Sequence, residues 1–201
     1  AQAINDEQLS DPRVRQAIAY AIDMDTIVET LLEGKAIAAD SMLPNGPHKP
    51  AGLNAYAYDP DKARELLAAA NWDSDRELDM VYYYGDQLTA DLMAAVQAYL
   101  SDVGVKMTYR KLEGDVGAQL TTRPTNPVDG ISNIDWDLGY GAAAATALQE
   151  YYNPYKTGGT SHTPGNAELD GLIDAINATA DPDAQRPAYF AIQEYWNTNL
   201  D

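Results

Sequence analysis

The chain has 201 residues, with 31 acidic against 13 basic side chains and a formal net charge of −18. Such an acidic chain is a poor partner for nucleic acid, and its 45% hydrophobic content argues against disorder. The absence of cysteine excludes disulfides and thiolate metal sites.

The first predicted element is a helix over residues 11–34. Asp11 before a proline is typical of a helix start, and Gly34 is typical of a helix end. Asp23 and Asp25 lie near its middle, where side chains two positions apart diverge by about 200° around the helix axis. They cannot act together as an acid–base pair, so we interpret them as structural or solvated carboxylates.

Helices and strands then alternate along the chain. The predicted elements are a helix over 59–72, a strand over 76–85, a helix over 85–104, strands over 105–113 and 134–141, and helices over 166–180 and 181–200. This order predicts an α/β fold in which the strand–helix–strand unit is a right-handed parallel crossover. The apolar stripe that begins at Leu88 predicts a core-facing side of its helix. The irregular stretches 35–58 and 123–134 are long enough to be functional or to pack on a neighbour.

Tyrosines give the best candidate site. The chain has 14 tyrosines and one phenylalanine, a composition that favours a wet, aromatic-lined surface because each buried hydroxyl needs a partner. In a strand, Tyr83 and Tyr84 point to opposite sides, so we expect only part of the Tyr-Tyr-Tyr run to line a cleft. Tyr140 ends a strand that continues through Gly141 and Ala142 into small residues, which let a ligand approach backbone amides. Cleft and core remain alternatives for Tyr83 and Tyr140.

Other chemistry has weaker support. His48 and His162 lie in separate loops without the spacing of metal ligands, and no phosphate-binding loop is present, so we expect no metal and no cofactor. Asp135 and Asp137 share a strand face, which leaves an acid hydrolase as an alternative. Another alternative is an extracellular interaction module that binds no small ligand.

The chain resembles the family 5 solute-binding proteins of peptide/nickel-type ABC importers. The resembling segments are "DPRVRQAIAYAIDMDTIVETLLEGKAIAADSMLP", "YDPDKARELLAAANW", "LMAAVQAYLSDVGVKMTYRKLE", "WDLGYG" and "NAELDGLIDAINATADPDAQRPAYFAIQEYW". The resemblance implies a periplasmic-binding-protein-like lobe (type II, cluster C), with a mixed sheet and helices on both faces. Residues 1–201 would be the lobe called domain III, which closes on a missing domain I to enclose a solute.

The resemblance also suggests individual ligand-binding residues. Arg123 ends the segment "GDVGAQLTTR", which is similar to a family stretch whose terminal Arg can contact ligand, whereas the aromatic residue expected seven positions earlier is Val116. Oligopeptide binders carry an aromatic–small–small–Asp run after the "WDL" strand, and here the matching residues run from Ala143 to Thr146. The carboxylate that would pair with a peptide amine is therefore missing. Oligosaccharides, modified peptides and opines become stronger candidate ligands beside oligopeptides.

The resemblance implies a non-enzymatic protein that captures a small solute for an ABC permease in the membrane. It places the protein outside the cytoplasm, in the periplasm or lipid-anchored at the outer face of the cell membrane. The sequence itself shows neither a membrane span nor a signal peptide at its start. It begins without Met and stops directly after a helical pattern, so we expect a piece of a longer protein.

Overall fold

The computed structural model describes residues 8–120, 134–159 and 165–200. The chain divides into two compact units. Unit 1 comprises residues 1–38, 56–116 and 135–141, and unit 2 comprises residues 39–55, 117–134 and 142–201. The prediction that residues 1–201 form a single lobe stays a prediction. Among the described residues, none of the helices combines the length and apolar character that a membrane span requires.

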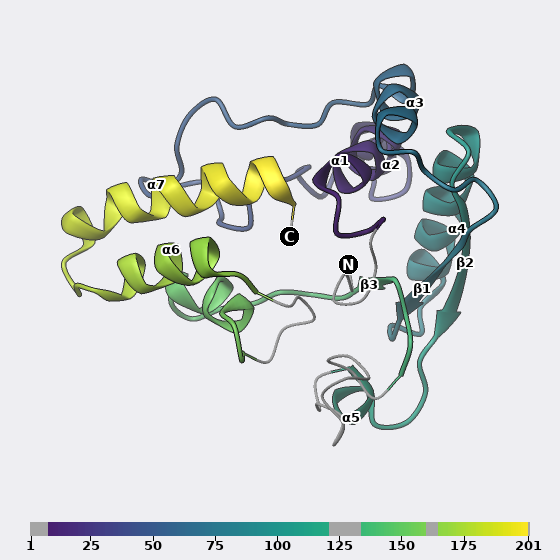
Figure 1. Ribbon diagram of the computed structural model, residues 1–201. Helices are drawn as coiled ribbons and strands as arrows, with labels where there is room; N and C mark the ends of the chain where they lie inside the picture. Colours follow the sequence, from purple (N-terminus) through teal and green to yellow (C-terminus); the bar gives the residue numbers. More distant parts are fainter. Residues whose placement is uncertain (1–7, 121–133, 160–164, 201) are drawn as a thin grey trace. The chain divides into compact units, whose positions relative to one another are not determined.

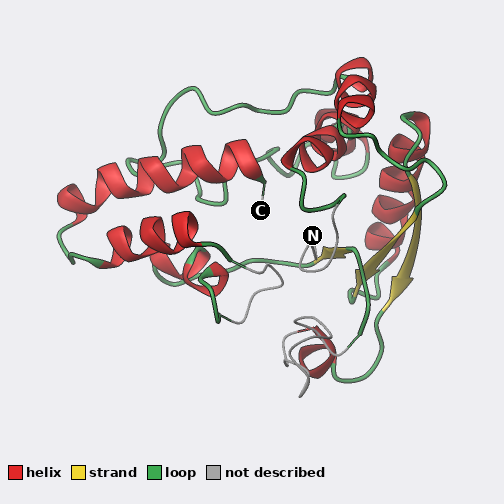
Figure 2. Cartoon of the chain, viewed as in Figure 1, coloured by secondary structure: helices red, strands yellow, loops and turns green. Residues whose placement is uncertain are grey.

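Unit 1 combines a small sheet with four helices within the described residues (Figure 1). Its elements are α1 (Pro12–Ala21), α2 (Met24–Thr30), α3 (Pro60–Ala69), β1 (Glu77–Tyr82), α4 (Gln87–Asp102), β2 (Lys106–Lys111) and β3 (Leu138–Tyr140). The strand order is β2-β1-β3, and β1 pairs in parallel with both neighbours (Figure 2). The α/β class and the parallel pairing across α4 are confirmed. The described strands form a parallel sheet, where a mixed one was predicted.

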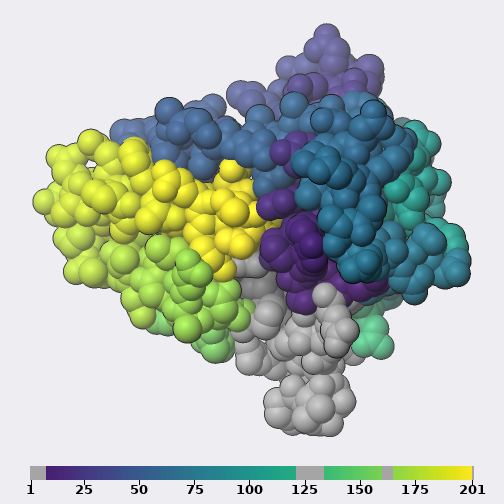
Figure 3. Space-filling model, turned by 45° about the horizontal axis from the view of Figure 1, so that its top comes forward, coloured from purple at the N-terminus to yellow at the C-terminus, as the bar shows by residue number. Residues whose placement is uncertain are grey.

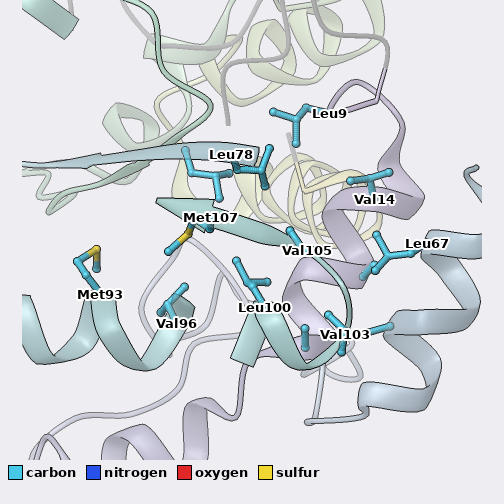
Figure 4. Close-up of a cluster of buried hydrophobic side chains, with 14 of the residues drawn as sticks. Leu9, Val14, Leu67, Leu78, Met93, Val96, Leu100, Val103, Val105 and Met107 are labelled. Atoms are coloured by element: carbon cyan, nitrogen blue, oxygen red, sulfur yellow. The ribbon is translucent and has the colours of Figure 1, made fainter. Parts of the chain in front are cut away.

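One face of this sheet carries the core of unit 1. Leu78 on β1 pairs with Met107 on β2, and both side chains are buried against α4. Figure 4 shows these two residues together with Leu100 of α4 and Val14 of α1. The alternation of β1 places Asp79 and Val81 on the other face. Asp79 forms an ion pair there with Arg110 of β2.

The predicted helix over 11–34 is wrong in its continuity, because it is two helices. Ile22 has an extended backbone and ends α1, and Asp23 is the N-cap of α2. The Asp23 carboxylate accepts hydrogen bonds from both the backbone N–H and the hydroxyl of Thr26. A side chain that bonds to the backbone in this way competes with a continuing helix and favours a new start. The structural interpretation of Asp23 is confirmed.

Two further expectations differ from the structure in detail. Leu88 lies in the first turn of α4 and is 44% exposed, so the core-facing stripe of this helix begins one turn later, at Leu92. The strand predicted over 134–141 is reduced to the three residues of β3. The chain before it is held by Asp137, whose backbone N–H and side chain both bond to Asp79.

Unit 2 is built around two helices, α6 (Ala167–Asn177) and α7 (Pro182–Asn199). Two 3₁₀ turns precede them, η2 (Leu148–Tyr151) and η3 (Asn153–Tyr155), and a five-residue helix, α5 (Val116–Leu120), follows β2 in the chain. The apolar sides of α6 and α7 meet in one buried cluster, which consists of Leu43, Tyr152, Leu169, Ile173, Ile176, Tyr189, Ile192 and Trp196.

Two buried amides of α7 hold the long loop 39–55 in unit 2. Gln193 accepts a hydrogen bond from the Ser41 hydroxyl and donates to the backbone carbonyl of His48. Asn197 accepts from the backbone N–H of Asn54 and donates to the carbonyl of the same residue. Figure 3 shows this loop, in blue, against the yellow surface of α7. The loop is therefore packed on a neighbouring element, as its length suggested.

Candidate functional site

Three tyrosines gather where β1 and β3 end. Tyr82 pairs with Tyr140 at the last position of the two parallel strands, so Tyr83 and Tyr84 follow at the same edge as Gly141. The carboxyl edge of a parallel sheet is where α/β folds place ligands. We call Tyr83, Tyr84 and Tyr140 the tyrosine cluster.

The rings of the tyrosine cluster contact one another. The ring centroids of Tyr83 and Tyr84 are 4.5 Å apart, and their hydroxyl oxygens are 3.3 Å apart. The Tyr140 ring meets Tyr84 edge-to-face at 6.0 Å. The expectation that Tyr83 and Tyr84 point to opposite sides is wrong, because β1 ends at Tyr82 and the alternation of a strand stops there.

Gly141 is required by the position of Tyr83. A Cβ atom added at Gly141 would lie 2.9 Å from the Tyr83 hydroxyl oxygen and 3.1 Å from its ring. Real Cβ atoms do not approach so closely, so any side chain at this position would displace the tyrosine. The structure thus brings together Tyr83, Tyr140 and Gly141 of the predicted site, and their role in binding stays a prediction.

Charged groups at this edge are engaged by protein partners. Asp86 is the N-cap of α4, and its carboxylate accepts from the backbone N–H and the hydroxyl of Thr89, which lowers the pKa of that carboxyl. Lys111, the last residue of β2, pairs with Glu113 at 2.9 Å. Partial burial raises the pKa of the Tyr140 hydroxyl, and the neighbouring Tyr84 and Asp86 raise it further. The Tyr140 hydroxyl is therefore neutral at ordinary pH.

Three of the remaining predicted residues, Ala142, Ala143 and Thr146, belong to unit 2. Ala142 and Ala143 are exposed residues of unit 2, where they lie in irregular chain. Thr146 donates from its backbone N–H to the carboxylate of Glu150, 2.8 Å away, and its hydroxyl also bonds that carboxylate. These bonds lower the pKa of Glu150 and mark the start of η2. Arg123 lies outside the described residues.

Sequence reasoning missed Tyr84 and Asp86 as members of this edge. The order of residues contained a signal for this edge. An N-cap residue, Asp86, directly after Tyr-Tyr-Tyr-Gly predicts that the strand ends before the last of the three tyrosines. Predicting the strand through residue 85 concealed that signal.

Residues considered for a hydrolase or a metal site have structural roles in the structure. The Asp137 carboxylate pairs with Arg76 at 2.7 Å and also accepts from the backbone N–H of Asp79. Asp137 is therefore committed to holding the sheet. His48 bonds through Nε2 to the carbonyl of Pro182. His162 lies outside the described residues, and within those residues no group of three or more His, Cys, Asp or Glu is placed to hold a metal ion.

Comparison with known families identifies the kind of protein that shares these features. The model of the bacterial extracellular solute-binding proteins, family 5 Middle, matches residues 3–162. A protein of Brucella ovis described as an ABC transporter peptide-binding protein is 38% identical over 106 residues, covering 51% of this chain and 20% of the relative. The glutathione-binding protein GsiB of Salmonella typhimurium is 23% identical over 195 residues, covering 95% of this chain and 38% of the relative.

A solved structure shares the fold. The oligopeptide-binding protein AppA of Bacillus subtilis, in complex with a nonapeptide, superposes with a TM-score of 0.77 at 22% identity, over 97% of this chain and 41% of that chain. This likeness confirms the periplasmic-binding-protein-like α/β fold. The chain spans between a fifth and about two fifths of the length of these three proteins.

Proposed function

The chain belongs to the bacterial extracellular solute-binding proteins of family 5, and we propose that the protein captures a small solute outside the cytoplasm for an ABC importer. The observation that carries this proposal is the family match over residues 3–162. The named relatives include an ABC transporter peptide-binding protein, which supports an importer as the partner system. The protein binds its solute without transforming it.

We further propose that this chain supplies one side of a closing clamp. The other side would come from a second lobe, domain I, and enclosure between the two would remove the solute from water. The tyrosine cluster at the carboxyl edge of the sheet would contribute ring faces and hydroxyls to this enclosure. A membrane permease would receive the loaded protein.

Peptide-like solutes have the broadest support among the candidate ligands. The relatives are named for peptide and glutathione binding, and AppA was solved with a nonapeptide. Modified peptides and oligosaccharides remain within the proposal, because the aligned run from Ala143 to Thr146 carries no carboxylate for a peptide amine. An unpaired buried ammonium would cost several kcal/mol.

Native mass spectrometry tests the proposal. The intact protein, purified without denaturation from its own host, should carry a stoichiometric small solute that is released on unfolding. Calorimetry with that solute should then show saturable binding by the intact protein and much weaker binding by the 201-residue chain alone, because one side of a clamp cannot desolvate the ligand. Full affinity in the isolated chain would contradict the clamp. The absence of any small solute, in the purified protein and in a ligand screen, would favour an interaction module instead.

A further inference from the structure

The tyrosine cluster and its surroundings expose apolar surface at the edge of the sheet. Tyr140 is 37% exposed, and Leu88, in the first turn of α4, is 44% exposed at the same end of the sheet. Large apolar side chains that remain accessible beside stacked rings are typical of a surface that a ring-shaped ligand covers. Gly141 leaves the space that the Tyr83 ring fills, and so keeps this ring in the cluster.

Asp86 and Lys111, two charged residues at this edge, have protein partners. Both oxygens of the Asp86 carboxylate accept from Thr89, and this carboxylate also caps α4. The Lys111 ammonium lies 2.9 Å from the Glu113 carboxylate. An anionic ligand group would have to displace Glu113 from Lys111, at an edge that also carries the Asp86 carboxylate. A neutral group meets no such penalty.

The hydroxyls of the cluster complete the pattern. The hydroxyl oxygens of Tyr83 and Tyr84 lie 3.3 Å apart, within hydrogen-bond distance. The Tyr140 hydroxyl, like that of an ordinary tyrosine, is protonated at neutral pH. Protonated phenols both donate and accept hydrogen bonds, so they can bond to neutral polar groups at the rim of a ring.

We propose that the tyrosine cluster holds an uncharged ring of the solute, with the ring against Tyr140 and its polar substituents bonded to the tyrosine hydroxyls. This assignment rests on the proposed function and specifies which part of the solute this lobe grips. The ring could belong to a sugar or to an aromatic side chain, because both present a flat or gently puckered C–H face and no charge.

The test uses the intact protein and Tyr140→Ala. Calorimetry is run with cellotriose, with N-acetylphenylalanine amide and with the free dipeptide lysyl-glutamate, which carries charges and no ring. The matched control is Tyr58→Ala. Tyr58 is 41% exposed and packs edge-to-face on Tyr99 at 5.5 Å, close to the geometry of Tyr140 on Tyr84, but it lies outside the tyrosine cluster.

We expect one of the two neutral probes to bind, and Tyr140→Ala to weaken that binding about tenfold while Tyr58→Ala leaves it within about twofold. The affinity should also be insensitive to added salt, because no charge pair is formed. Whether cellotriose or the aromatic amide binds distinguishes the two sources of the ring.

Several outcomes would overturn the assignment while leaving solute capture intact. These are binding of lysyl-glutamate alone, equal effects of the two tyrosine substitutions, or a co-purified solute that contains no uncharged ring. If no probe binds and no solute co-purifies, both the assignment and solute capture are refuted.

Discussion

Arg76 and Asp137 form an ion pair, with 2.7 Å between Nη2 and Oδ1, that joins the residue before β1 to the residue before β3. The second oxygen of Asp137 accepts from the backbone N–H of Asp79 at 2.8 Å, and the Asp137 backbone N–H donates to the Asp79 carbonyl. One side chain therefore fixes β3 against β1. The two strands end side by side as a consequence, with Tyr140 opposite Tyr82.

Replacing Asp137 by Ala should lower the free energy of unfolding by about 1–3 kcal/mol, because it removes the acceptor of a partly buried amide and of an ion pair. Urea denaturation followed by circular dichroism measures this change. Asp135→Ala is the control, since Asp135 is exposed and, among the described residues, only its backbone carbonyl takes part in a hydrogen bond, which Arg110 donates. It should change stability by less than about 0.5 kcal/mol. Equal effects of the two substitutions would contradict the structural role of Asp137.

Replacing Gly141 by Ala should weaken solute binding several-fold with little effect on folding. The new Cβ would lie 2.9 Å from the Tyr83 hydroxyl oxygen, and the tyrosine ring, rather than the backbone, would move. Calorimetry with the co-purified solute measures the affinity. Gly171→Ala is the matched control, because no atom lies within 4 Å of its added Cβ and it sits inside α6. That control should keep full affinity and gain up to about 1 kcal/mol of stability. Unchanged affinity in Gly141→Ala would show that the close contact between Gly141 and Tyr83 has no role in solute binding.

Replacing Asn197 by Ala should release the loop 39–55 from α7. Asn197 is 8% exposed, and its amide bonds to the backbone of both Asn54 and Asp40. Its loss leaves partly buried backbone groups without these partners, at about 1–3 kcal/mol. Limited proteolysis should therefore cut within 39–55 faster than in the parent protein. Glu194→Ala, on the exposed side of the same helix, should leave the cleavage rate unchanged. A resistant loop in Asn197→Ala would show that other contacts hold it.

Acid should destabilise the protein through its helix caps. Asp86 has its pKa lowered by bonds from Thr89, and the pKa of Asp11 is lowered by hydrogen bonding to Arg13. A carboxyl with a lowered folded pKa contributes stability that is present above its unfolded pKa, near 4, and is lost as pH falls through the folded value. The urea concentration at which half of the protein is unfolded should therefore decrease as the pH falls below about 4.

Asp86→Asn tests the origin of this pH dependence. Asparagine is also a good N-cap, so the variant should fold normally at neutral pH but lose less stability between neutral pH and acid than the parent. Asp86→Ala should be destabilised at neutral pH as well. An unchanged pH profile in Asp86→Asn would exclude this carboxyl as a source of the acid sensitivity.

Helix starts were predictable because their signals are local. The Asp–Pro pairs at Asp11, Asp59 and Asp181 each cap a helix in the structure, with the aspartate accepting from a backbone N–H two or three residues later. The parallel strand–helix–strand unit followed from the pattern of apolar residues over 76–113. Helix ends were harder, because Asp23 reads equally well as an exposed helical residue and as a cap.

The tyrosines show where sequence reasoning stops. The tyrosine-rich composition favoured an aromatic-lined surface, yet Tyr152 is fully buried in unit 2 and packs on Trp196 at 5.9 Å. Tyr140 is more than a third exposed at the sheet edge. Both side chains have the same chemistry, and only the packing of distant segments decides which one water reaches.

By itself the sequence determined the helix starts, the α/β order and the resemblance to family 5, because each of these depends on neighbouring residues or on a linear motif. The tertiary structure alone decided that Asp137 holds β3 to β1, that Tyr140 packs on Tyr84, and that Gly141 makes room for Tyr83. These relationships join segments more than 50 residues apart. No local propensity contains them, because side-chain contacts between distant segments exist only once the sheet has formed.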